Sequence, residues 1–323
     1  MEPSDAHRNH PDLNALTLPE LAAQLRQTGL TDRLIKLAFD EDLGESAHDW
    51  TGELMFTPED QRRVQMRARE PGVLAGVEFL DDLVNAFSQP GEIECEVFMR
   101  DGECLEPGSV IAELSGSARA IVRLERTMLN LIARMSAIAT RTNHFVTLVQ
   151  GTDAQICDTR KTTPGLRAFE KYAVRCGGGT THRMGLFDAV LIKDNHLAGI
   201  EGPEMASKIA AKLEAVAAKI ASEAIGLWFV QVEVDTLEQL EGVLAAKPGT
   251  VDIILLDNMS TDQLRKAVAM RDALADGTGP QLEASGGISE TTVSSIAQSG
   301  VDRISIGGLT HQAQSIDIGL DAI

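Results

Sequence analysis

The chain has 323 residues, of which 43% are hydrophobic, so it can form one large domain or two domains of ordinary size. Its formal net charge of −19 argues against general binding to nucleic acid or to anionic membranes. No apolar run approaches the roughly 20 residues that a membrane-spanning helix requires. Residues 1–19 contain several charged side chains and no apolar core of the signal-peptide type, so we expect a loose soluble extension there.

The cysteines and histidines indicate neither a structural metal nor a disulfide framework. The spacing of the four cysteines matches no zinc-binding pattern, and they are Cys95, Cys104, Cys157 and Cys176. A chain of this length does not need disulfides for stability, so we expect reduced thiols and a cytoplasmic protein. The sequence has no HExxH motif and no Cys/His cluster, which argues against a tightly held transition metal.

Residues 1–115 are predicted to form strands with few long helices. A helix is expected over residues 34–42, and apolar and polar residues alternate over 61–70 and again over 92–100. Asp101-Gly102 is typical of a hairpin turn, and a short apolar run follows at 110–114. This pattern predicts a small antiparallel sheet with helices on one face.

The pattern changes after residue 117. Residues 118–149 are helical in character, with a break expected near Met135 and Ser136. Short apolar strands then alternate with amphipathic helices, and the strands are expected at 155–157, 189–193, 229–234, 253–256, 281–284 and 303–306. This alternation predicts a parallel sheet. The number of units in this length favours a closed α/β barrel, although spacing alone leaves an open sheet as an alternative.

Polar residues or glycines follow every one of these strands. In an α/β barrel the functional site lies at the carboxyl ends of the strands. Basic residues come first, acidic residues in the middle and glycines last. The residues concerned are Arg160, Lys161, Lys193, Glu233, Asp257, Ser285, Gly286, Gly287, Gly307 and Gly308.

Basic side chains gather between residues 160 and 193. They are Arg160, Lys161, Arg167, Lys171, Arg175, Arg183 and Lys193, and only Glu170 and Asp188 oppose them. In so acidic a protein this cluster indicates a pocket for a small polyanion. A solvated basic surface loop is the alternative, and charge alone leaves the two equally open.

The glycines and the acids each suit part of a phosphorylated ligand. Glycines allow backbone N–H groups to approach an anion, and after the last barrel strands they often form a phosphate site. The alternatives are plain turns for the glycines and a helix cap for Ser285. Glu233 and Asp257 suit ribose hydroxyls or Mg²⁺ held on pyrophosphate, and their alternative is ion pairing with nearby basic side chains.

At these residues the chain resembles the quinolinate phosphoribosyltransferase family. The segment at 158–196, DTRKTTPGLRAFEKYAVRCGGGTTHRMGLFDAVLIKDNH, is similar to the family signature almost from end to end. Further similar segments lie at 41–44, 125–140, 232–240, 254–259, 283–288 and 305–311. The resemblance extends from about Leu34 to the end. Residues 44–51 are longer than the usual Gly-Asp-Thr of the family, so we assign no role to His48 or Asp49.

The resemblance implies an α/β fold with two domains. Residues 1–30 are expected to form an N-terminal extension, and residues 31–132 an α/β sandwich that the tail at 313–323 joins. Residues 133–312 are expected to form an incomplete, seven-stranded α/β barrel with the phosphoribosyl site. The resemblance also implies a homodimer or higher homo-oligomer with composite active sites.

The same resemblance implies a role for each strand-end residue. Quinolinate is expected to contact Arg126, Arg160, His182, Arg183 and Lys193, with Arg126 reaching across the dimer interface. The expected catalytic residues are Lys161, Glu233 and Asp257. The phosphoribosyl group and its phosphates are expected at Glu233, Asp257, Ser285, Gly286, Gly287, Gly307 and Gly308. Mg²⁺ is expected on the substrate pyrophosphate, with Glu233 and Asp257 as candidate ligands.

The implied reaction joins quinolinate to phosphoribosyl pyrophosphate and gives nicotinate mononucleotide, pyrophosphate and CO₂ in de novo NAD biosynthesis. Arginine forks and lysine charges suit the two carboxylates of quinolinate. One alternative is a phosphoribosyltransferase for a related pyridine carboxylate such as nicotinate. Another is a non-catalytic barrel that binds a phosphorylated ligand, since a fold by itself does not establish activity.

Overall fold

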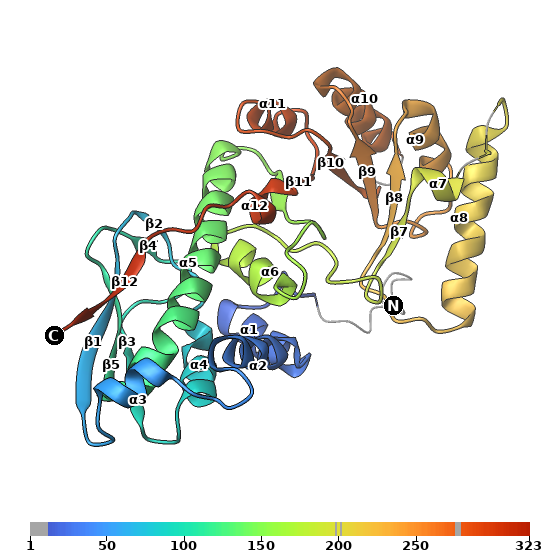
Figure 1. The fold of residues 1–323 in the computed structure, drawn as a ribbon. Helices are drawn as coiled ribbons and strands as arrows, with labels where there is room; N and C mark the ends of the chain where they lie inside the picture. Colours follow the sequence, from blue (N-terminus) through green and yellow to red (C-terminus); the bar gives the residue numbers. More distant parts are fainter. Residues whose placement is uncertain (1–11, 198, 201, 275–278) are drawn as a thin grey trace. The chain divides into compact units, whose positions relative to one another are not determined.

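The computed structural model describes residues 12–323 apart from 198, 201 and 275–278, so residues 1–11 of the expected N-terminal extension lie outside the described residues. The described chain divides into two units, each with its own sheet (Figure 1). One comprises residues 14–144, 161–179 and 308–323, and we call it the antiparallel-sheet unit. The other comprises mainly residues 145–160 and 180–307, and we call it the parallel-sheet unit.

The antiparallel-sheet unit contains a four-stranded sheet in the order β12-β1-β5-β3. Its strands are β1 (Gln61–Ala68), β3 (Ile93–Val97), β5 (Val110–Ser117) and β12 (Ile318–Ala322). Every neighbouring pair is antiparallel, and the last strand of the chain pairs with β1. In β1 the apolar side chains at 64, 66 and 68 are buried while residues between them are less so. The prediction of a small antiparallel sheet is therefore confirmed, and β2 (Gly72–Val73) with β4 (Cys104–Leu105) adds a two-stranded sheet.

The helices of this unit are α1 (Leu18–Gln27), α2 (Leu30–Leu43), α3 (Trp50–Met55), α4 (Leu80–Phe87), α6 (Arg167–Cys176), α12 (Gly308–His311) and most of α5 (Ala118–Leu148), with a 3-10 turn η1 (Val77–Phe79). Helix α5 runs unbroken through residues 135 and 136, so the expected break is wrong. Ser136 stays helical because its hydroxyl accepts the N–H of Ala75 at 3.0 Å. Thr140, one turn further on, accepts the N–H of Val73 at 2.8 Å.

Residues 14–30 are integrated into the antiparallel-sheet unit, whereas the sequence predicted an extension up to residue 30. Helix α1 begins with a capping box at Thr17 and buries Leu21, Ala22 and Leu25. Arg175 donates to the backbone carbonyls of Asn14 at 3.1 Å and Leu16 at 2.9 Å. The apolar spacing of this segment is helical, and the prediction overlooked it.

The parallel-sheet unit contains six strands in the order β6-β11-β10-β9-β8-β7, and all of their pairs are parallel. They are β6 (Gln155–Cys157), β7 (Val190–Ile192), β8 (Val230–Val234), β9 (Ile253–Asp257), β10 (Gln281–Ser285) and β11 (Arg303–Ser305). A single parallel bridge joins Cys157 to Thr180, so a seventh strand is reduced to one bridging residue in the described chain. The α/β class is confirmed, and closure of the sheet into a barrel stays a prediction.

Helices connect the strands of this sheet, as a parallel arrangement requires. They are α7 (Asp194–Leu197), α8 (Met205–Ser222), α9 (Leu237–Leu244), α10 (Thr261–Asp272) and α11 (Val293–Ala297), and Figure 1 shows α8 to α10 beside β7 to β9. Capping boxes at Thr236 and Ser260 start α9 and α10. The strands are mainly apolar and buried, and they also contain the buried polar side chains of Gln231, Glu283 and Arg303.

The sequence-based domain limits, 31–132 and 133–312, stay a prediction. In the structure, residues 161–179 group with the antiparallel-sheet unit although they lie between β6 and β7 in the sequence. Within the described residues, no helix is both long and apolar enough to cross a membrane.

We expect Leu21→Ala to lower the free energy of unfolding by about 2–5 kcal/mol, the usual cost of removing a fully buried leucine side chain. Urea titration followed by circular dichroism measures this change. Gln27→Ala, at an exposed position in the last turn of the same helix, is the control and should have little effect. Equal and small effects of the two substitutions would mean that α1 is peripheral to the unit.

Candidate active site

The carboxyl ends of the parallel strands bring most of the predicted site residues to one edge of the sheet (Figure 1). Asp257 is the last residue of β9 and pairs in register with Ser285, the last residue of β10. Glu233 of β8 pairs with Leu255 of β9, and Lys193 follows β7 directly. Because parallel strands end on the same side, these residues share one edge, as predicted from their positions after the strands.

Glu233 forms an ion pair with Lys193, whose Nζ lies 3.4 Å from its Oε2. The side chain of Glu233 is 14% exposed and that of Lys193 is 46% exposed. An ion pair with one partner so accessible to water contributes little to stability. The pairing proposed as the alternative role of Glu233 therefore exists, and it leaves both groups near the surface where a ligand can contact them.

Asp257, Asn258 and Gly286 form a tight corner between β9 and β10. Asn258 adopts a positive φ of 53°, donates to the carboxylate of Asp257 at 2.6 Å and bonds the carbonyl of Ser285 at 2.9 Å. A Cβ on Gly286, which has a φ of 91°, would lie 2.1 Å from Oδ1 of Asn258. Gly286 is required for this close approach, so its role includes more than a plain turn.

Gly287 differs from Gly286 because its surroundings are open. It adopts a φ of 60°, and a Cβ built there meets nothing within 4 Å. The next helix, α11, begins only at Val293 and is preceded by Thr292 as its N-cap. Ser285 therefore does not cap α11, so the alternative of a helix cap for this residue is wrong.

Arg183 is a buried cation, with only 7% of its surface exposed, and its Nη1 donates to the carbonyl of Ala189 at 3.2 Å. Burial lowers the pKa of Arg183, the positive charge of Arg160 lowers it further, and Asp188 acts in the opposite direction. A shift of this kind means that two guanidinium groups repel each other where water is partly excluded. An anion placed between them would relieve this repulsion, which favours a polyanion site over a solvated basic loop.

His182 directly precedes Arg183 and is 6% exposed. Its Nδ1 accepts the backbone N–H of Arg183 at 2.8 Å, and its Nε2 lies 2.6 Å from Oε1 of Gln231. Gln231 was not singled out from the sequence. The signal was present, because residues two apart in a strand share a face, and this places Gln231 on the same face of β8 as Glu233.

A buried ion pair between Glu283 and Arg303 lies next to His182. Arg303 Nε bonds Oε2 of Glu283 at 2.9 Å, and its Nη2 lies 2.9 Å from Sγ of Cys157. Burial acts to raise the pKa of Glu283, but the nearby His182 and the charge and hydrogen bond of Arg303 outweigh it, so the pKa lies below its ordinary value. Burial acts to lower the pKa of Arg303, but the interactions with Cys157 and Glu283 outweigh burial, so the pKa of Arg303 lies above its ordinary value.

The remaining basic residues of the predicted cluster belong to the antiparallel-sheet unit, together with Lys161. Thr310 donates to the backbone carbonyl of Lys161 at 2.7 Å. Glu170 accepts from both the backbone N–H and the hydroxyl of Thr163 at 3.1 and 2.9 Å, and Arg134 bonds Glu170 at 2.9 Å. The sequence identified Glu170 only as an acid opposing the basic cluster, and its ion pair with Arg134, which holds the segment that follows Lys161, was not predicted.

Gly307 and Gly308 follow β11. Gly307 is partly exposed, and Gly308 opens α12. The carbonyl of Gly308 accepts Nε of Arg141 at 2.8 Å, and a Cβ there would lie 2.5 Å from Oε1 of Gln312. The lack of a side chain at Gly308 therefore serves local packing in its own unit.

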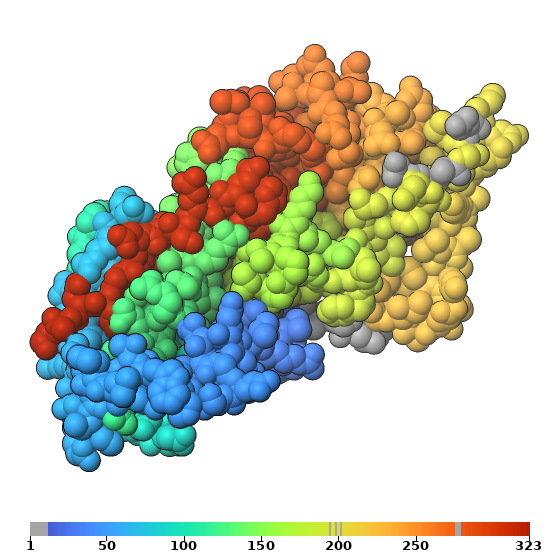
Figure 2. Space-filling view, viewed as in Figure 1, coloured from blue at the N-terminus to red at the C-terminus, as the bar shows by residue number. Residues whose placement is uncertain are grey.

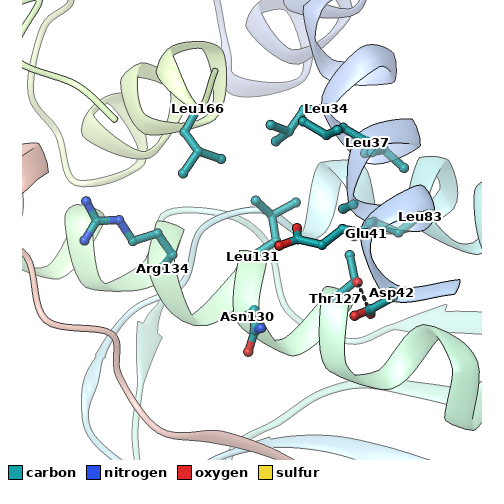
Figure 3. Close-up of a pocket in the computed structure, with 12 residues that line it drawn as sticks. Leu34, Leu37, Glu41, Asp42, Leu83, Thr127, Asn130, Leu131, Arg134 and Leu166 are labelled. Atoms are coloured by element: carbon teal, nitrogen blue, oxygen red, sulfur yellow. Dashed lines mark hydrogen bonds between the residues drawn. The ribbon is translucent and has the colours of Figure 1, made fainter. Parts of the chain in front are cut away.

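Arg126 lies on the exposed side of α5, close to a pocket of about 400 Å³ in the antiparallel-sheet unit. Figure 3 shows the pocket between α2 and α5, with Thr127 bonded to Asp42 at 2.9 Å. The lining is mainly apolar and comprises Leu34, Ile35, Leu37, Ala38, Glu41, Asp42, Leu83, Thr127, Asn130, Leu131, Arg134 and Leu166. Within the part of the chain that the structure describes, Arg126 forms no ion pair, with Glu125 or with another acid.

The same unit exposes several large apolar side chains on α2 and α3. Leu37 and Trp50 are each 63% exposed, Leu54 is 81% exposed and Met55 is 71% exposed. The segment that carries them is blue in Figure 2 and lies at the surface of the face shown. Apolar side chains exposed in such a group are typical of a surface that contacts another protein.

The fold and the strand-end residues define an α/β protein that concentrates cations, acids and glycines at one edge of a parallel sheet. The chain matches the quinolinate phosphoribosyl transferase N-terminal domain over residues 49–136 and the C-terminal domain of the same family over residues 138–321. It therefore belongs to the quinolinate phosphoribosyl transferase family, as its resemblance to that family predicted.

Individual relatives agree with this assignment. The chain is similar to the nicotinate-nucleotide pyrophosphorylase (carboxylating) of Mycobacterium leprae, with 43% identity over 262 residues, 79% of this chain and 84% of that protein. It is 38% identical to a probable enzyme of the same name in Bacillus subtilis over 90% of this chain and 92% of that protein. The solved structure of the nicotinate-nucleotide pyrophosphorylase from Francisella tularensis has 32% identity and a TM-score of 0.78, covering 98% of this chain and 100% of that one.

Proposed function

We propose that this chain is a quinolinate phosphoribosyltransferase that converts quinolinate and phosphoribosyl pyrophosphate to nicotinate mononucleotide, pyrophosphate and CO₂. The observation that carries the proposal is the match to both domains of the quinolinate phosphoribosyl transferase family, in a chain whose parallel strands place Lys193, Glu233, Asp257 and Ser285 at one edge of the sheet. The relatives that match over most of their length are named as carboxylating pyrophosphorylases. That name describes the reverse direction of the reaction, so it supports the release of CO₂ in the direction proposed here. The reaction supplies a nucleotide for de novo NAD biosynthesis.

Quinolinate binding follows from the charge of the site. The two carboxylates lie on adjacent ring carbons, and each arginine fork can form two parallel hydrogen bonds to one of them. Lys193, with its exposed ammonium group, adds a third positive charge at the same strand edge. Binding a dianion would relieve the repulsion between Arg160 and Arg183, so the second carboxylate contributes directly to affinity.

The ribose and phosphate groups are assigned to the acidic and glycine-rich strand ends. Glu233 and Asp257 accept hydrogen bonds from ribose hydroxyls, and Ser285 donates to a phosphate oxygen. Gly287 has open space where a side chain would stand, and this suits backbone contacts to phosphate. Gly286, Gly307 and Gly308 complete the expected phosphate-binding set.

Mg²⁺ fits the donors at this edge. Glu233 lies one residue before the end of β8, Asp257 ends the neighbouring β9, and both are partly exposed. Mg²⁺ in proteins usually takes one or two carboxylates together with substrate phosphates. Among the residues described, no cluster of three or more His, Cys, Asp or Glu could hold a metal by itself. When bound on the pyrophosphate, Mg²⁺ would balance the charge of the leaving group.

The reaction breaks the bond between C1 of the ribose and pyrophosphate and forms a bond from C1 to the pyridine nitrogen. The leaving pyrophosphate takes the electron pair, and Lys161 is assigned to stabilise its charge. The nitrogen is then quaternary, so the ring can accept the electrons released when the adjacent carboxylate departs as CO₂, and water supplies a proton to that carbon. No protein nucleophile is required, because fixed geometry and charge can provide most of the rate.

A homodimer or higher homo-oligomer with composite sites is part of the proposal. The exposed apolar group on α2 and α3 and the pocket beside Arg126 support a protein–protein contact on the antiparallel-sheet unit. The unpaired Arg126 guanidinium supports the role of a ligand arm over that of a local ion pair, within the described residues. A cytoplasmic location belongs to the proposal too, and it is supported by the four cysteines, none of which forms a disulfide in the described residues.

We expect quinolinate to be a substrate and nicotinate to be rejected by roughly 10⁴ or more in kcat/KM. A site built for two carboxylates leaves charged groups unpaired when one carboxylate is missing. An assay with either acid, phosphoribosyl pyrophosphate and Mg²⁺, following nucleotide and CO₂ together, measures the ratio. Comparable rates would favour the nicotinate alternative, and binding of both substrates without turnover would favour the non-catalytic one.

We expect Arg183→Ala to weaken quinolinate binding at least about tenfold and phosphoribosyl pyrophosphate binding much less, because a charge-assisted hydrogen bond contributes about 1.5–3 kcal/mol. Arg160→Ala should act in the same direction. Asp257→Ala should show the opposite preference. Isothermal titration calorimetry with each ligand separates the effects, and equal losses for both ligands would mean that the assignment of the strand ends is wrong.

We expect activity to return when two inactive variants, Arg126→Ala and Lys161→Ala, are refolded together. If Arg126 serves the neighbouring subunit, one site of each heterodimer carries both substitutions and the other carries none. Random pairing makes about half of the dimers mixed, so about a quarter of the wild-type rate should return. Heterodimers confirmed by mass spectrometry that stay inactive would show that Arg126 acts within its own subunit or only in the fold.

A further inference from the structure

The segment that carries Arg183 is held by side chains at four consecutive backbone N–H groups. Asp158 Oδ1 accepts from His182 at 2.8 Å, and Nδ1 of His182 accepts from Arg183 at 2.8 Å. The two carboxylate oxygens of Asp188 accept from Met184 at 2.6 Å and from Gly185 at 2.9 Å. Backbone N–H groups need such partners when they are buried outside helices and strands, so these acceptors determine where the arginine lies.

The hydrogen bond at Nδ1 determines which nitrogen of His182 carries the proton. A backbone N–H can only donate, so Nδ1 must be the acceptor, and the neutral ring therefore carries its proton on Nε2. The partner of Nε2 must in turn accept. Oε1 of Gln231 lies 2.6 Å away, and an amide oxygen is an acceptor. The orientation of the glutamine amide follows from the same reasoning.

Glu283 provides a second acceptor near Nε2 of His182, in addition to Gln231. Oε1 of Glu283 lies 3.6 Å from Nε2 of His182, and Arg303 binds the other carboxylate oxygen at 2.9 Å. Gln231 and Glu283 are both fully buried. Both of these groups present an acceptor oxygen to Nε2, and moving the proton to Nδ1 would break the hydrogen bonds to Gln231 and to the Arg183 backbone in a buried place.

We propose that Gln231, with the Glu283–Arg303 pair behind it, is a positioning residue that fixes His182 in its Nε2–H form, so that Nδ1 holds the Arg183 backbone and thereby the guanidinium. The inference rests on the proposed function, in which Arg183 binds a quinolinate carboxylate. Gln231 acts through His182 and has no direct contact with substrate in this scheme. His182 is then neutral and serves in positioning, and it is not the general acid of the reaction.

The first test concerns the ring itself and does not depend on activity. Selective ¹⁵N labelling of the seven histidines, with a His182→Asn variant for assignment, reports the protonated nitrogen of His182 by long-range ¹H–¹⁵N correlation. We expect the Nε2–H form near neutral pH. A ring protonated on Nδ1, or on both nitrogens, would overturn the inference whether or not the chain turns over quinolinate.

The second test uses substitutions at residue 231. Gln231→Met keeps the length of the side chain but removes the amide acceptor, and we expect KM for quinolinate to rise about tenfold with KM for phosphoribosyl pyrophosphate within about twofold. Gln231→Glu restores an acceptor and should recover most of the lost quinolinate affinity. Gln298→Met, at an exposed position of the same unit, is the control for the substitution itself.

The outcomes separate a positioning role from a structural one. An equal rise in both KM values, no rise in either, or a failure of Gln231→Glu to restore quinolinate affinity would overturn the inference. If Gln231→Met does not fold, the comparison of Gln231→Glu with wild type and the histidine spectra still decide it. A wild-type protein that is inactive with quinolinate would refute the proposed function, while the spectra would test the His182 assignment by themselves.

Discussion

The buried ion pair between Glu283 and Arg303 is the interaction on which the arrangement of the parallel strand ends depends. It joins the middle of β10 to the first residue of β11, where Glu283 and Arg303 are also paired in register. Glu283 is fully buried and Arg303 is 7% exposed, so removal of one partner would leave an uncompensated charge and cost about 3–5 kcal/mol. A hydrophobic pair would stabilise the strands equally well. The charges of Glu283 and Arg303 therefore have a use beyond stability. Because Glu283 lies close to His182, we infer that this use is to fix the His182 ring.

Charge in this chain is divided between groups that hold the fold and groups that remain available to ligands. Arg175 and Arg134 donate to backbone carbonyls in the antiparallel-sheet unit, and Arg134 also pairs with the buried Glu170. Arg183 differs, because the neighbouring Arg160 adds to the effect of burial and lowers its pKa. In a protein with a net charge of −19, like charges kept together need a specific reason, and an anionic substrate provides one.

The sequence predicted the elements with strong periodicity and the residues that follow the strands, because both depend on local pattern. It placed Asp257 and Ser285 at strand ends, and their register in the sheet confirms the expectation that they share an edge. It failed at α1, at the continuity of α5 and at Gln231. Leu21 and Ser136 depend on which distant segment packs against them, and Gln231 reads as one polar residue in an apolar strand. Contacts between distant segments decide the continuity of α5, whereas the helical spacing of α1 and the position of Gln231 two residues before Glu233 were present in the sequence and were overlooked.

The segment around Arg183 explains why a long signature can accompany a small site. A helix or strand would have satisfied its backbone N–H groups with other backbone groups, and almost any residue could then occupy those positions. Here Asp158, His182 and Asp188 supply the acceptors instead. Each needs its own support, so His182 requires Gln231 from another strand. Because side chains position this one guanidinium, the identities of supporting residues such as Asp158, Asp188 and Gln231 are also constrained. The constrained stretch of sequence is therefore longer than the set of residues that contact the ligand.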